Sequence, residues 1–459
     1  MSADPDLEAM AARVVSWVLD HLRGLPEQPV GTLGDAERLR RLLHEPAPEG
    51  PTPFADVLER FSRAVAPFAF RPNHPRFLAF IPSAPSPVSI LADWLAAGCN
   101  FFAGVWLEAA GPTRVELTVL DWFRTLLGMP EGSSGLLTGG GSSANLTALV
   151  AARERLSREQ RGRAVMYVSG QRHWSLDRAA HVAGFYPEQI RAVACDDMQR
   201  MDVSALARAI AEDRAAGLVP WLVAANAGTT NTGAIDPLGE IAGACRREVL
   251  WLHVDAAYGW ANALVPEGLE ELAGIEMADS VTLDPHKWFA TGFDAGALLV
   301  RDPATLERAF KLRPEYMQDV VPGEGEVNFC DRGIDLSRRF RALKIWLPVQ
   351  VQGLGWYREM VRHTRGLARF AGERLAAAGF EIASPPRLGL VGFRWPGADA
   401  LNLTLTERVR DGGEMFLSTT TLSGRVVLRM CFVNRATTEA DVVRCVEVLA
   451  REARRLAGG

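Results

Sequence analysis

Asp284-Pro285-His286-Lys287-Trp288 ends one apolar, strand-like run of this sequence, and His253-Val254-Asp255-Ala256-Ala257-Tyr258 ends an earlier one. A carboxylate at the end of such a run is costly to leave unpaired, so Asp255 needs a cationic partner. Lys287 lies between a strand and an aromatic pair, where desolvation favours the neutral, reactive amine. Taken singly, each residue also has an ordinary explanation, because an arginine can pair with the aspartate and the lysine ammonium can extend into water.

Short apolar runs alternate with helical patterns from about Glu116 onward. The predicted strands are Ala164–Val168, Trp221–Ala225, Leu250–Val254, Ser280–Leu283 and Ala297–Val300, and the predicted helices include Leu146–Arg155 and Val203–Ala216. Buried strands that alternate with helices predict an α/β fold with a mostly parallel central sheet flanked by helices. Ligands of such sheets bind at the carboxyl ends of the strands. Four polar residues fall at such ends: Thr229, Thr230, Asp255 and Asp284.

A glycine-rich stretch, Thr138-Gly139-Gly140-Gly141-Ser142-Ser143-Ala144-Asn145, precedes the predicted helix Leu146–Arg155. Glycines let the backbone approach an anion closely, and the free N–H groups of a first helical turn bind phosphate together with serine hydroxyls. A glycine-rich helix cap without a ligand is an equally ordinary reading of this stretch alone. It is not a P-loop, because no Gly-Lys-Ser/Thr follows.

His173 follows the strand Ala164–Val168 in the stretch Gln171-Arg172-His173-Trp174-Ser175. A single histidine is more often structural, but one in a loop beside a binding site can stack on a planar ring.

Together, Lys287, Asp255 and the glycine-rich stretch predict a binding site for pyridoxal phosphate (PLP). The lysine amine condenses with the cofactor aldehyde, and the carboxylate keeps the pyridine nitrogen protonated, so that the ring withdraws electrons from the substrate α-carbon.

Different patterns flank this region on both sides. Leu7–Leu25 repeats apolar residues at helical spacing, and Pro26–Pro53 predicts an extended linker with one short helix. A long helix is expected over Ser337–Gln352, followed by strand-rich pieces at Gly389–Trp395 and Arg425–Val433. We therefore expect three parts, listed in chain order: a helical and extended dimerisation segment (1–86), a large PLP-binding domain (87–343) and a small α+β domain (344–459).

Composition excludes several classes of protein. The 459 residues are 48% hydrophobic and 23% charged, with a formal charge of −5 and a pI near 6.0, which gives no reason to expect nucleic acid or an anionic membrane as partner. The six cysteines are scattered, without a Cys-x-x-Cys pair, so reduced thiols and no metal site are predicted. The N-terminus does not read as a signal peptide, and no apolar run reaches the ~18–20 residues that span a bilayer. We expect a cytoplasmic protein.

The chain resembles the pyridoxal-dependent group II amino-acid decarboxylases, and most of all the aromatic-L-amino-acid decarboxylase family. The similarity runs from His74-Pro75-Arg76-Phe77 to Leu428-Arg429-Met430. It implies a fold-type-I PLP enzyme, similar to aspartate aminotransferase, that acts as a homodimer with shared active sites. By this resemblance Lys287 bonds to the cofactor, Asp255 pairs with the pyridine nitrogen and His173 stacks on the ring. The remaining cofactor contacts would be Gly141, Ser142, Ser143, Thr230, Ala257, Asp284 and His286.

Tyr316 precedes a polar, glycine-containing stretch, Asp319–Asp331, that reads as a mobile loop. Similar decarboxylases carry on such a loop a tyrosine that closes over the neighbouring subunit's site and protonates the α-carbon after CO₂ leaves. Relatives that make aldehydes often have phenylalanine there. The resemblance thus makes Tyr316 catalytic and favours simple decarboxylation, although a surface aromatic is the ordinary alternative.

The predicted substrate pocket is apolar, which suits a flat side chain. Its residues are Phe80, Ile81, Pro82, Phe102 and Trp106. None is an arginine, and a distal carboxylate usually calls for one, so glutamate and aspartate are disfavoured as substrates. Compared with the animal enzymes, Phe80-Ile81-Pro82-Ser83 replaces Tyr-Phe-Pro-Thr, Ala103–Glu108 differs from a segment that crosses the dimer interface, and Asp284 replaces an asparagine. Ser337 occupies a place where plant relatives favouring phenolic substrates tend to have serine.

The sequence therefore predicts PLP-dependent decarboxylation of an L-amino acid, of the tyrosine, tryptophan, phenylalanine or DOPA type, to the amine and CO₂. A decarboxylating aldehyde synthase on the same scaffold is the alternative in mechanism. A serine α/β hydrolase with Ser142 as nucleophile is the alternative of another class. The hydrolase is disfavoured because Ser142 follows no clear strand in the sequence and because it leaves Lys287 and Asp255 unexplained.

Overall fold

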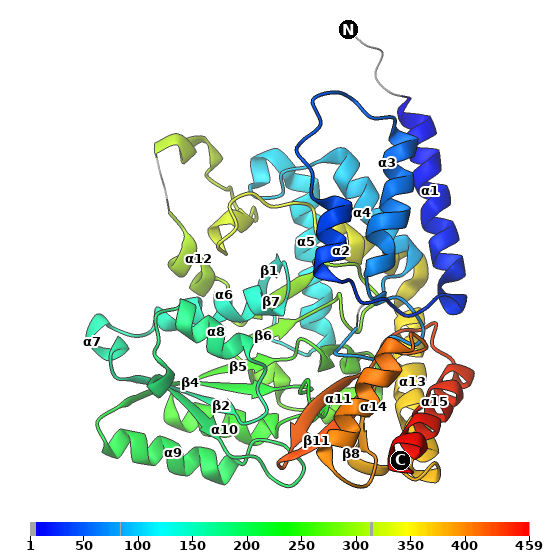
Figure 1. Cartoon of the computed structure of the whole chain (residues 1–459). Helices are drawn as coiled ribbons and strands as arrows, with labels where there is room; N and C mark the ends of the chain where they lie inside the picture. Colours follow the sequence, from blue (N-terminus) through cyan, green and yellow to red (C-terminus); the bar gives the residue numbers. More distant parts are fainter. Residues whose placement is uncertain (1–5, 83, 313–314, 459) are drawn as a thin grey trace. The chain divides into compact units, whose positions relative to one another are not determined.

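A computed structural model describes residues 6–82, 84–312 and 315–458, and for residues 316–318 it describes the backbone alone (Figure 1). The chain divides into two compact units. The larger unit comprises residues 83–366 and 386–390. The smaller comprises residues 1–82, 367–385 and 391–459.

The larger unit is built on a seven-stranded sheet with the order β1-β7-β6-β5-β4-β2-β3. Its strands are β1 (Ser134–Thr138), β2 (Ala164–Ser169), β3 (Ile190–Val193), β4 (Val219–Asn226), β5 (Trp251–Asp255), β6 (Ser280–Leu283) and β7 (Gly296–Val300). β7 runs antiparallel to both β1 and β6, and the remaining neighbours are parallel. In the register of the sheet, Asp255 lies opposite Asn226 of β4 and opposite Thr282 of β6. The carboxyl ends of β4, β5 and β6 therefore lie side by side.

Helices cover the sheet of the larger unit, as Figure 1 shows. They are α4 (Pro87–Cys99), α5 (Trp106–Leu126), α6 (Gly141–Arg153), α7 (Arg158–Arg161), α8 (Ser175–Val182), α9 (Val203–Ala215), α10 (Leu238–Glu248), α11 (Pro266–Glu271), α12 (Ala304–Phe310) and the first part of α13 (Leu343–Ala377). Every residue of β2 and β5 is buried. Leu149 of α6 and Leu176 of α8 belong to one apolar cluster with Met166 and Leu222 of the sheet. The predicted mostly parallel sheet flanked by helices is confirmed.

In the larger unit, two strands and one helix start escaped the sequence analysis. β1 contains Gly135, and a Cβ there would lie 1.7 Å from the Leu298 carbonyl oxygen, so the glycine permits close pairing but weakens the apolar pattern. β3 is only partly buried and lacks a continuous apolar run. α6 begins at Gly141, five residues before the predicted start, because its first turn consists of small polar residues that face a cavity.

The predicted start of the long helix at Ser337 was wrong, since α13 begins at Leu343. The Arg338 carbonyl accepts a hydrogen bond from the Ala103 amide (2.8 Å), and its guanidinium donates to Glu116 Oε1 (2.5 Å) and to the Leu137 carbonyl (3.0 Å). These contacts hold 337–342 as an irregular segment. The helix then continues to Ala377, through a kink at Gly353.

The smaller unit contains α1 (Leu7–Gly24), α2 (Ala36–Leu43), α3 (Phe54–Arg60), α14 (Asp399–Asp411), α15 (Glu439–Ala457) and the end of α13. Its four-stranded sheet has the order β10-β11-β9-β8, with β8 (Glu381–Arg387), β9 (Leu390–Arg394), β10 (Ser418–Leu422) and β11 (Arg425–Cys431). Leu375, Phe393, Leu405, Leu428 and Leu449 lie in one buried apolar cluster. The unit is α+β, and its sequence pattern missed β8, which contains Pro385 and Pro386.

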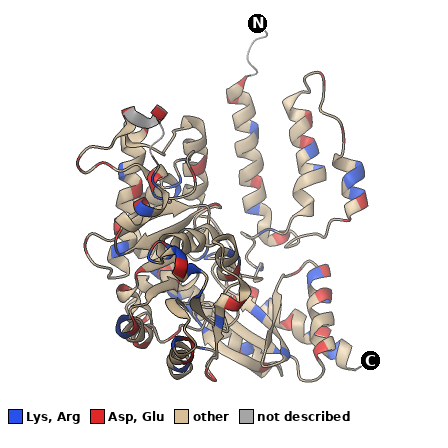
Figure 2. Ribbon diagram, turned by 90° about the vertical axis from the view of Figure 1, so that its left-hand side faces the viewer, with Lys and Arg blue, Asp and Glu red and all other residues tan. Residues whose placement is uncertain are grey.

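Charges of both signs are interspersed along the helices (Figure 2). Several form ion pairs one helical turn apart, such as Arg40 with Glu37 and Arg63 with Glu59. Among the described helices, none combines the length and the apolarity that a crossing of the bilayer requires.

Candidate active site

One cavity of about 340 Å³ opens at the carboxyl ends of the central strands, wholly within the larger unit. Its lining comprises Gly139, Gly140, Gly141, Ser142, Ser143, Asn145, His173, Ser175, Asn226, Gly228, Thr229, Thr230, Asp255, Ala257, Tyr258, Asp284, His286 and Lys287. Lys287 and Asp255 therefore share a single cavity. The predicted cofactor contacts Gly141, Ser142, Ser143, Thr230, Ala257, Asp284 and His286 line it as well.

Lys287 lies in the turn that follows β6. Its amide donates to the Asp284 carbonyl (2.9 Å), and its Nζ lies 3.0 Å from Asp284 Oδ2. The Lys287 side chain is 21% exposed, whereas that of Asp284 is only 3% exposed. The second oxygen of Asp284, Oδ1, has no hydrogen-bond partner among the described residues. The pair thus leaves a buried acceptor beside a reachable amine.

Asp255 ends β5 and is 7% exposed. Its Oδ1 accepts from the Ala257 amide (3.2 Å) and its Oδ2 accepts from the side-chain amide of Asn145 (2.9 Å). Both donors are neutral, so the carboxylate keeps its negative charge toward the cavity. A cationic N–H group inside the cavity is what such a carboxylate favours.

The N-terminus of α6 forms one side of the cavity. The backbone of Gly140 provides the N-cap without a side-chain cap, and Ser142 and Ser143 are exposed in the first turn. A Cβ on Gly141 would lie 2.8 Å from Asp284 Oδ2 and 3.2 Å from the Ala257 side chain, so this position needs glycine. Free N–H groups, hydroxyls and a helix dipole together form an anion site.

His173 lines the same cavity just before α8. Its Nδ1 accepts from the Ser175 amide (3.3 Å) and lies 2.8 Å from the Ser175 hydroxyl. Burial is the main cause that lowers the pKa of His173, and the negative charge of Asp255 opposes this shift. The neutral imidazole is a flat apolar face with one N–H group.

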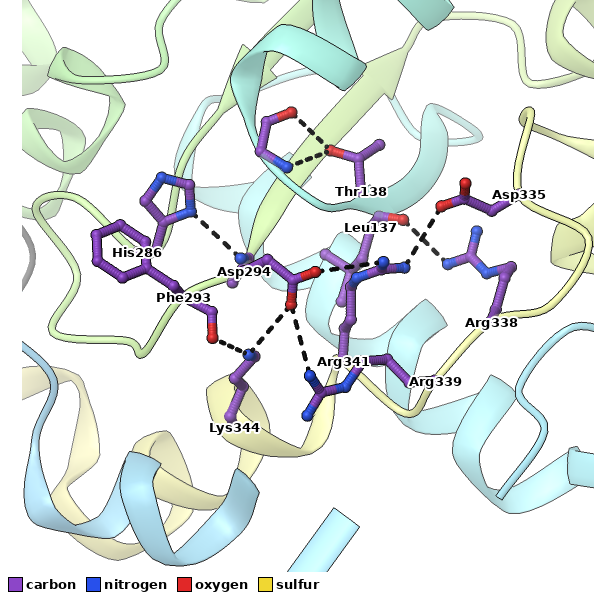
Figure 3. Close-up of polar contacts among 12 residues, drawn as sticks. Leu137, Thr138, His286, Phe293, Asp294, Asp335, Arg338, Arg339, Arg341 and Lys344 are labelled. Atoms are coloured by element: carbon purple, nitrogen blue, oxygen red, sulfur yellow. Dashed lines mark hydrogen bonds and ion pairs between the residues drawn. The ribbon is translucent and has the colours of Figure 1, made fainter. Parts of the chain in front are cut away.

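An ion-pair network anchors the loop that follows Lys287 (Figure 3). Lys344 Nζ donates to the Phe293 carbonyl (2.7 Å), and Arg341 Nη2 lies 3.5 Å from Asp294 Oδ2. The Ala295 amide then donates to His286 Nδ1 (3.2 Å). Through these contacts the loop holds His286 against the glycine turn, where a Cβ on Gly140 would lie 3.2 Å from its ring.

The predicted substrate-pocket residues do not line this cavity. Phe102 and Trp106 belong to the larger unit, and the Trp106 amide donates to Asn328 Oδ1 (2.8 Å). Phe80, Ile81 and Pro82 belong to the smaller unit, where Phe80 is 58% exposed. Tyr316 lies in a short 3₁₀ helix, η7 (Glu315–Val320); its side chain, like Ser83, lies outside the described residues.

The sequence analysis missed several residues of the cavity wall, chiefly Asn145, Ser175, Asn226 and Tyr258. Asn145 stands four positions after Gly141, and helical spacing puts both on one face of α6. That spacing was the available signal. Asn226 ends β4, as Asp255 ends β5, and the same strand-end argument applies to it.

The chain matches the family described as "Pyridoxal-dependent decarboxylase conserved domain" over residues 36–396. The chain belongs to this family. An aromatic-L-amino-acid decarboxylase of Bacillus atrophaeus is 39% identical over 97% of this chain and 96% of that protein. A phenylacetaldehyde synthase of Arabidopsis thaliana is 32% identical over 96% of this chain and 94% of that protein. The crystal structure of Oryza sativa TDC with PLP and tryptamine has a TM-score of 0.94 at 28% identity, covering 99% of both chains.

This pyridoxal-dependent decarboxylase is a carboxy-lyase with the fold of type-I PLP enzymes. The cavity residues fit its cofactor. The space beside Gly141, which a Cβ would fill, and the uncapped N-terminus of α6 suit a phosphate. The buried Asp255 carboxylate, whose protein donors are neutral, suits a pyridinium N–H group. The amine of Lys287 suits the aldehyde.

One argument against a serine hydrolase was wrong, because β1 does precede Ser142 and forms a strand–turn–helix with α6. No hydrogen bond joins the Ser142 hydroxyl to a histidine in the described part of the chain, so the serine has no base. Family membership excludes the hydrolase independently.

His253, two residues before Asp255, makes stability depend on pH. Burial lowers the pKa of His253 from 6.5 to about 4, so the unfolded chain binds more protons between these values. Stability therefore falls as pH drops from 6.5 toward 4, by about 2 kcal/mol at pH 5 for this residue. Denaturant unfolding gives the free energy of unfolding at pH 7 and at pH 5. The difference between these two values should be smaller for His253→Gln than for the parent protein. Equal differences in both proteins would contradict this prediction.

Proposed function

We propose that this decarboxylase converts an aromatic L-amino acid to its amine and CO₂. The observation that carries the proposal is that Lys287 and Asp255 line one cavity together with the N-terminus of α6, which has no side-chain cap. The substrate class is supported by the aromatic-L-amino-acid decarboxylase of Bacillus atrophaeus, which matches nearly the whole chain.

In this proposal, the residues of the cavity would hold PLP. Lys287 would bond to its aldehyde carbon with release of water, Asp255 would hold the proton on its pyridine nitrogen, and His173 and Ala257 would contact its ring. The phosphate contacts are Gly141, Ser142 and Ser143, with Thr230 and His286 nearby. Bound PLP withdraws electrons from the substrate α-carbon, which lets the bond to the carboxylate break. Asp284 Oδ2, in contact with Lys287 Nζ, accepts the proton that the ammonium must lose before it bonds.

A substrate panel tests the proposed substrate class. The purified enzyme with PLP is given tyrosine, tryptophan, phenylalanine and DOPA, with glutamate and aspartate as matched acidic controls, and both CO₂ and amine are measured. We expect amine from at least one aromatic substrate and none from the acidic pair. The reason is that none of Phe80, Ile81, Pro82, Phe102 and Trp106, the proposed pocket, can pair with a distal carboxylate. Turnover of glutamate alone would contradict the proposal.

Tyr316 is the proposed proton donor to the α-carbon. Tyr316→Phe removes this hydroxyl, so we expect amine formation to fall by about 10²-fold and the aldehyde to rise. The aldehyde route consumes substrate, O₂ and water and releases the aldehyde, CO₂, ammonia and hydrogen peroxide, which keeps atoms and electrons balanced. Product chromatography with a peroxide assay measures both routes. An unchanged amine yield would remove Tyr316 from the mechanism.

A homodimer with shared sites is also proposed. α4 exposes apolar side chains, with Leu91, Trp94 and Leu95 each more than half exposed, and α1 exposes Val14 and Leu19. Large exposed apolar side chains on one helix mark an interaction surface. We propose that residues 1–86, which include α1, serve dimerisation, that 87–343 bind the cofactor and that 344–459 form a third domain.

Mixed dimers test the shared site. Lys287→Ala and Tyr316→Phe subunits are unfolded and refolded together, so that about half of the dimers contain one of each. One site of such a dimer then has both Lys287 and the partner's tyrosine. We therefore expect more amine formation than with either variant alone. Amine yield and light scattering are measured. Mixed dimers without recovery would show that Tyr316 acts within its own subunit.

The cytoplasm is the proposed compartment. All six cysteines lie in the described residues and none forms a disulfide, and Cys245, Cys330, Cys431 and Cys445 are buried. Buried thiols outside disulfides are typical of a reducing compartment.

A further inference from the structure

Asn145 makes three side-chain hydrogen bonds, which use both of its N–H groups and one lone pair of its oxygen. Its Nδ2 group donates to Asp255 Oδ2 (2.9 Å) and to the Ser175 hydroxyl (3.0 Å), and its Oδ1 lies 3.0 Å from His253 Nε2. The residue is 1% exposed, so no water competes for these bonds. The carboxylate of Asp255 can only accept, which fixes the side of the amide that faces it.

His253 determines the other side of the Asn145 amide. Because Asn145 Oδ1 can only accept, His253 Nε2 must carry the hydrogen. His253 Nδ1 lies 2.8 Å from the Ser280 hydroxyl, and that hydroxyl already accepts from Trp251 Nε1 (2.8 Å), an obligate donor. The Ser280 hydrogen is therefore available for Nδ1. Burial of the fully enclosed imidazole keeps it neutral, with a pKa of about 4.

The same bonds reach His173 in the opposite direction. The Ser175 hydroxyl accepts one hydrogen from Asn145 and donates its own to His173 Nδ1, which also accepts from the Ser175 amide. Two donors at Nδ1 leave the hydrogen of the neutral ring on Nε2. A single buried amide is thus bonded to the proposed partner of the pyridine nitrogen and, through Ser175, to the proposed stacking histidine.

We propose that Asn145 is the positioning residue for Asp255, and that His253, as the Nε2–H tautomer with Ser280 bonded at Nδ1, holds the Asn145 amide in this orientation. The inference rests on the proposed role of Asp255 toward the cofactor. The network confines the Asp255 carboxylate to one rotamer and leaves its charge unneutralised, because each of its two protein donors is a neutral amide. Loss of the network frees the carboxylate to rotate away from the ring.

The first test needs no cofactor, and a variant serves only to assign the signal. The full-length protein is labelled with ¹⁵N-histidine, and the imidazole nitrogens are observed by NMR, with the His253→Gln spectrum to assign the signal. We expect His253 to show a protonated Nε2 and an unprotonated Nδ1 from pH 6 to 8. A purely structural histidine is free to adopt either tautomer. The Nδ1–H tautomer would overturn the proposal.

The second test measures PLP binding and the ¹⁵N shift of the labelled pyridine nitrogen in holoenzyme variants. Asn145→Ala should raise the PLP dissociation constant by about 10-fold and move the ¹⁵N shift toward that of the unprotonated ring. His253→Leu cannot donate a hydrogen bond to Asn145 and should have the same two effects. His253→Gln can donate one and should keep most of the PLP binding. Asn402→Ala, which removes a fully buried asparagine of the smaller unit, is the matched control and should leave both readouts unchanged.

The outcomes separate the inference from the proposed role of Asp255. An unchanged ¹⁵N shift in Asp255→Asn would reject the role itself. A changed shift in Asp255→Asn, with parental binding and shift in Asn145→Ala, would reject the positioning role alone. If Asn145→Ala does not fold, Ser280→Ala takes its place. This change removes the donor to His253 Nδ1 together with the acceptor of Trp251 Nε1. Parental binding in that folded variant would equally reject the proposal.

Discussion

Replacing Lys287 with alanine is expected to lower decarboxylation by about 10³-fold or more and to remove the cofactor absorption near ~420 nm. The sequence has only three lysines, Lys287, Lys311 and Lys344. Lys287 lines the cavity, Lys311 pairs with Glu307 at 3.9 Å, and Lys344 is bonded to Asp93 and to the Phe293 carbonyl. No second amine can therefore replace Lys287 in the described cavity.

The scarcity of lysine makes this prediction unusually sharp. Borohydride reduction of the holoenzyme followed by peptide mass spectrometry should place the cofactor on the Lys287 peptide alone. Lys311→Ala is the matched control, because it removes a lysine of the same larger unit outside the cavity and should keep the absorption band and the activity. Label on the Lys344 peptide, or a band that survives in Lys287→Ala, would contradict the assignment.

The sequence predicted the centre of the fold well because its strands are buried on both faces. β2, β4, β5, β6 and β7 read as continuous apolar runs, and the carboxyl ends of the parallel strands β4, β5 and β6 carry polar residues of the cavity. Where burial is incomplete, as in β3, or where a glycine interrupts the strand, as in β1, this signal is lost.

Contacts between distant residues account for the rest of the difference. Nothing local in 337–342 opposes a helix, and the start at Leu343 depends on Arg338 reaching Glu116 and Leu137. Asn145 and His253 are 108 positions apart, so their contact arises only when α6 packs against β5. Sequence patterns identified the groups that are proposed to touch the cofactor but not those that are proposed to orient them.

Asp255→Ala is expected to lower kcat by about 10²- to 10³-fold even when PLP is supplied at saturating concentration. The physical reason is electrostatic. A carboxylate that is 7% exposed and has only neutral protein donors would stabilise positive charge on a bound pyridine nitrogen far more than water does, and that charge would make the ring an electron acceptor. Steady-state kinetics with an aromatic substrate measure kcat, and the ~420 nm absorption of the holoenzyme separately measures whether PLP is bound.

Asp213 offers a control matched in burial and chemistry. It is also 7% exposed, but it accepts from the Tyr167 hydroxyl (2.9 Å) and pairs with Arg191 (3.0 Å) outside the cavity. Asp213→Asn should therefore cost stability while leaving kcat within about two-fold of the parent. If Asp255→Ala kept full activity, the ring nitrogen would not need a partner, and the electron-withdrawing role assigned to this carboxylate would have to be abandoned. A kcat loss confined to the Asp255 variant would instead separate the effect of charge at the ring from the general cost of removing a buried carboxylate.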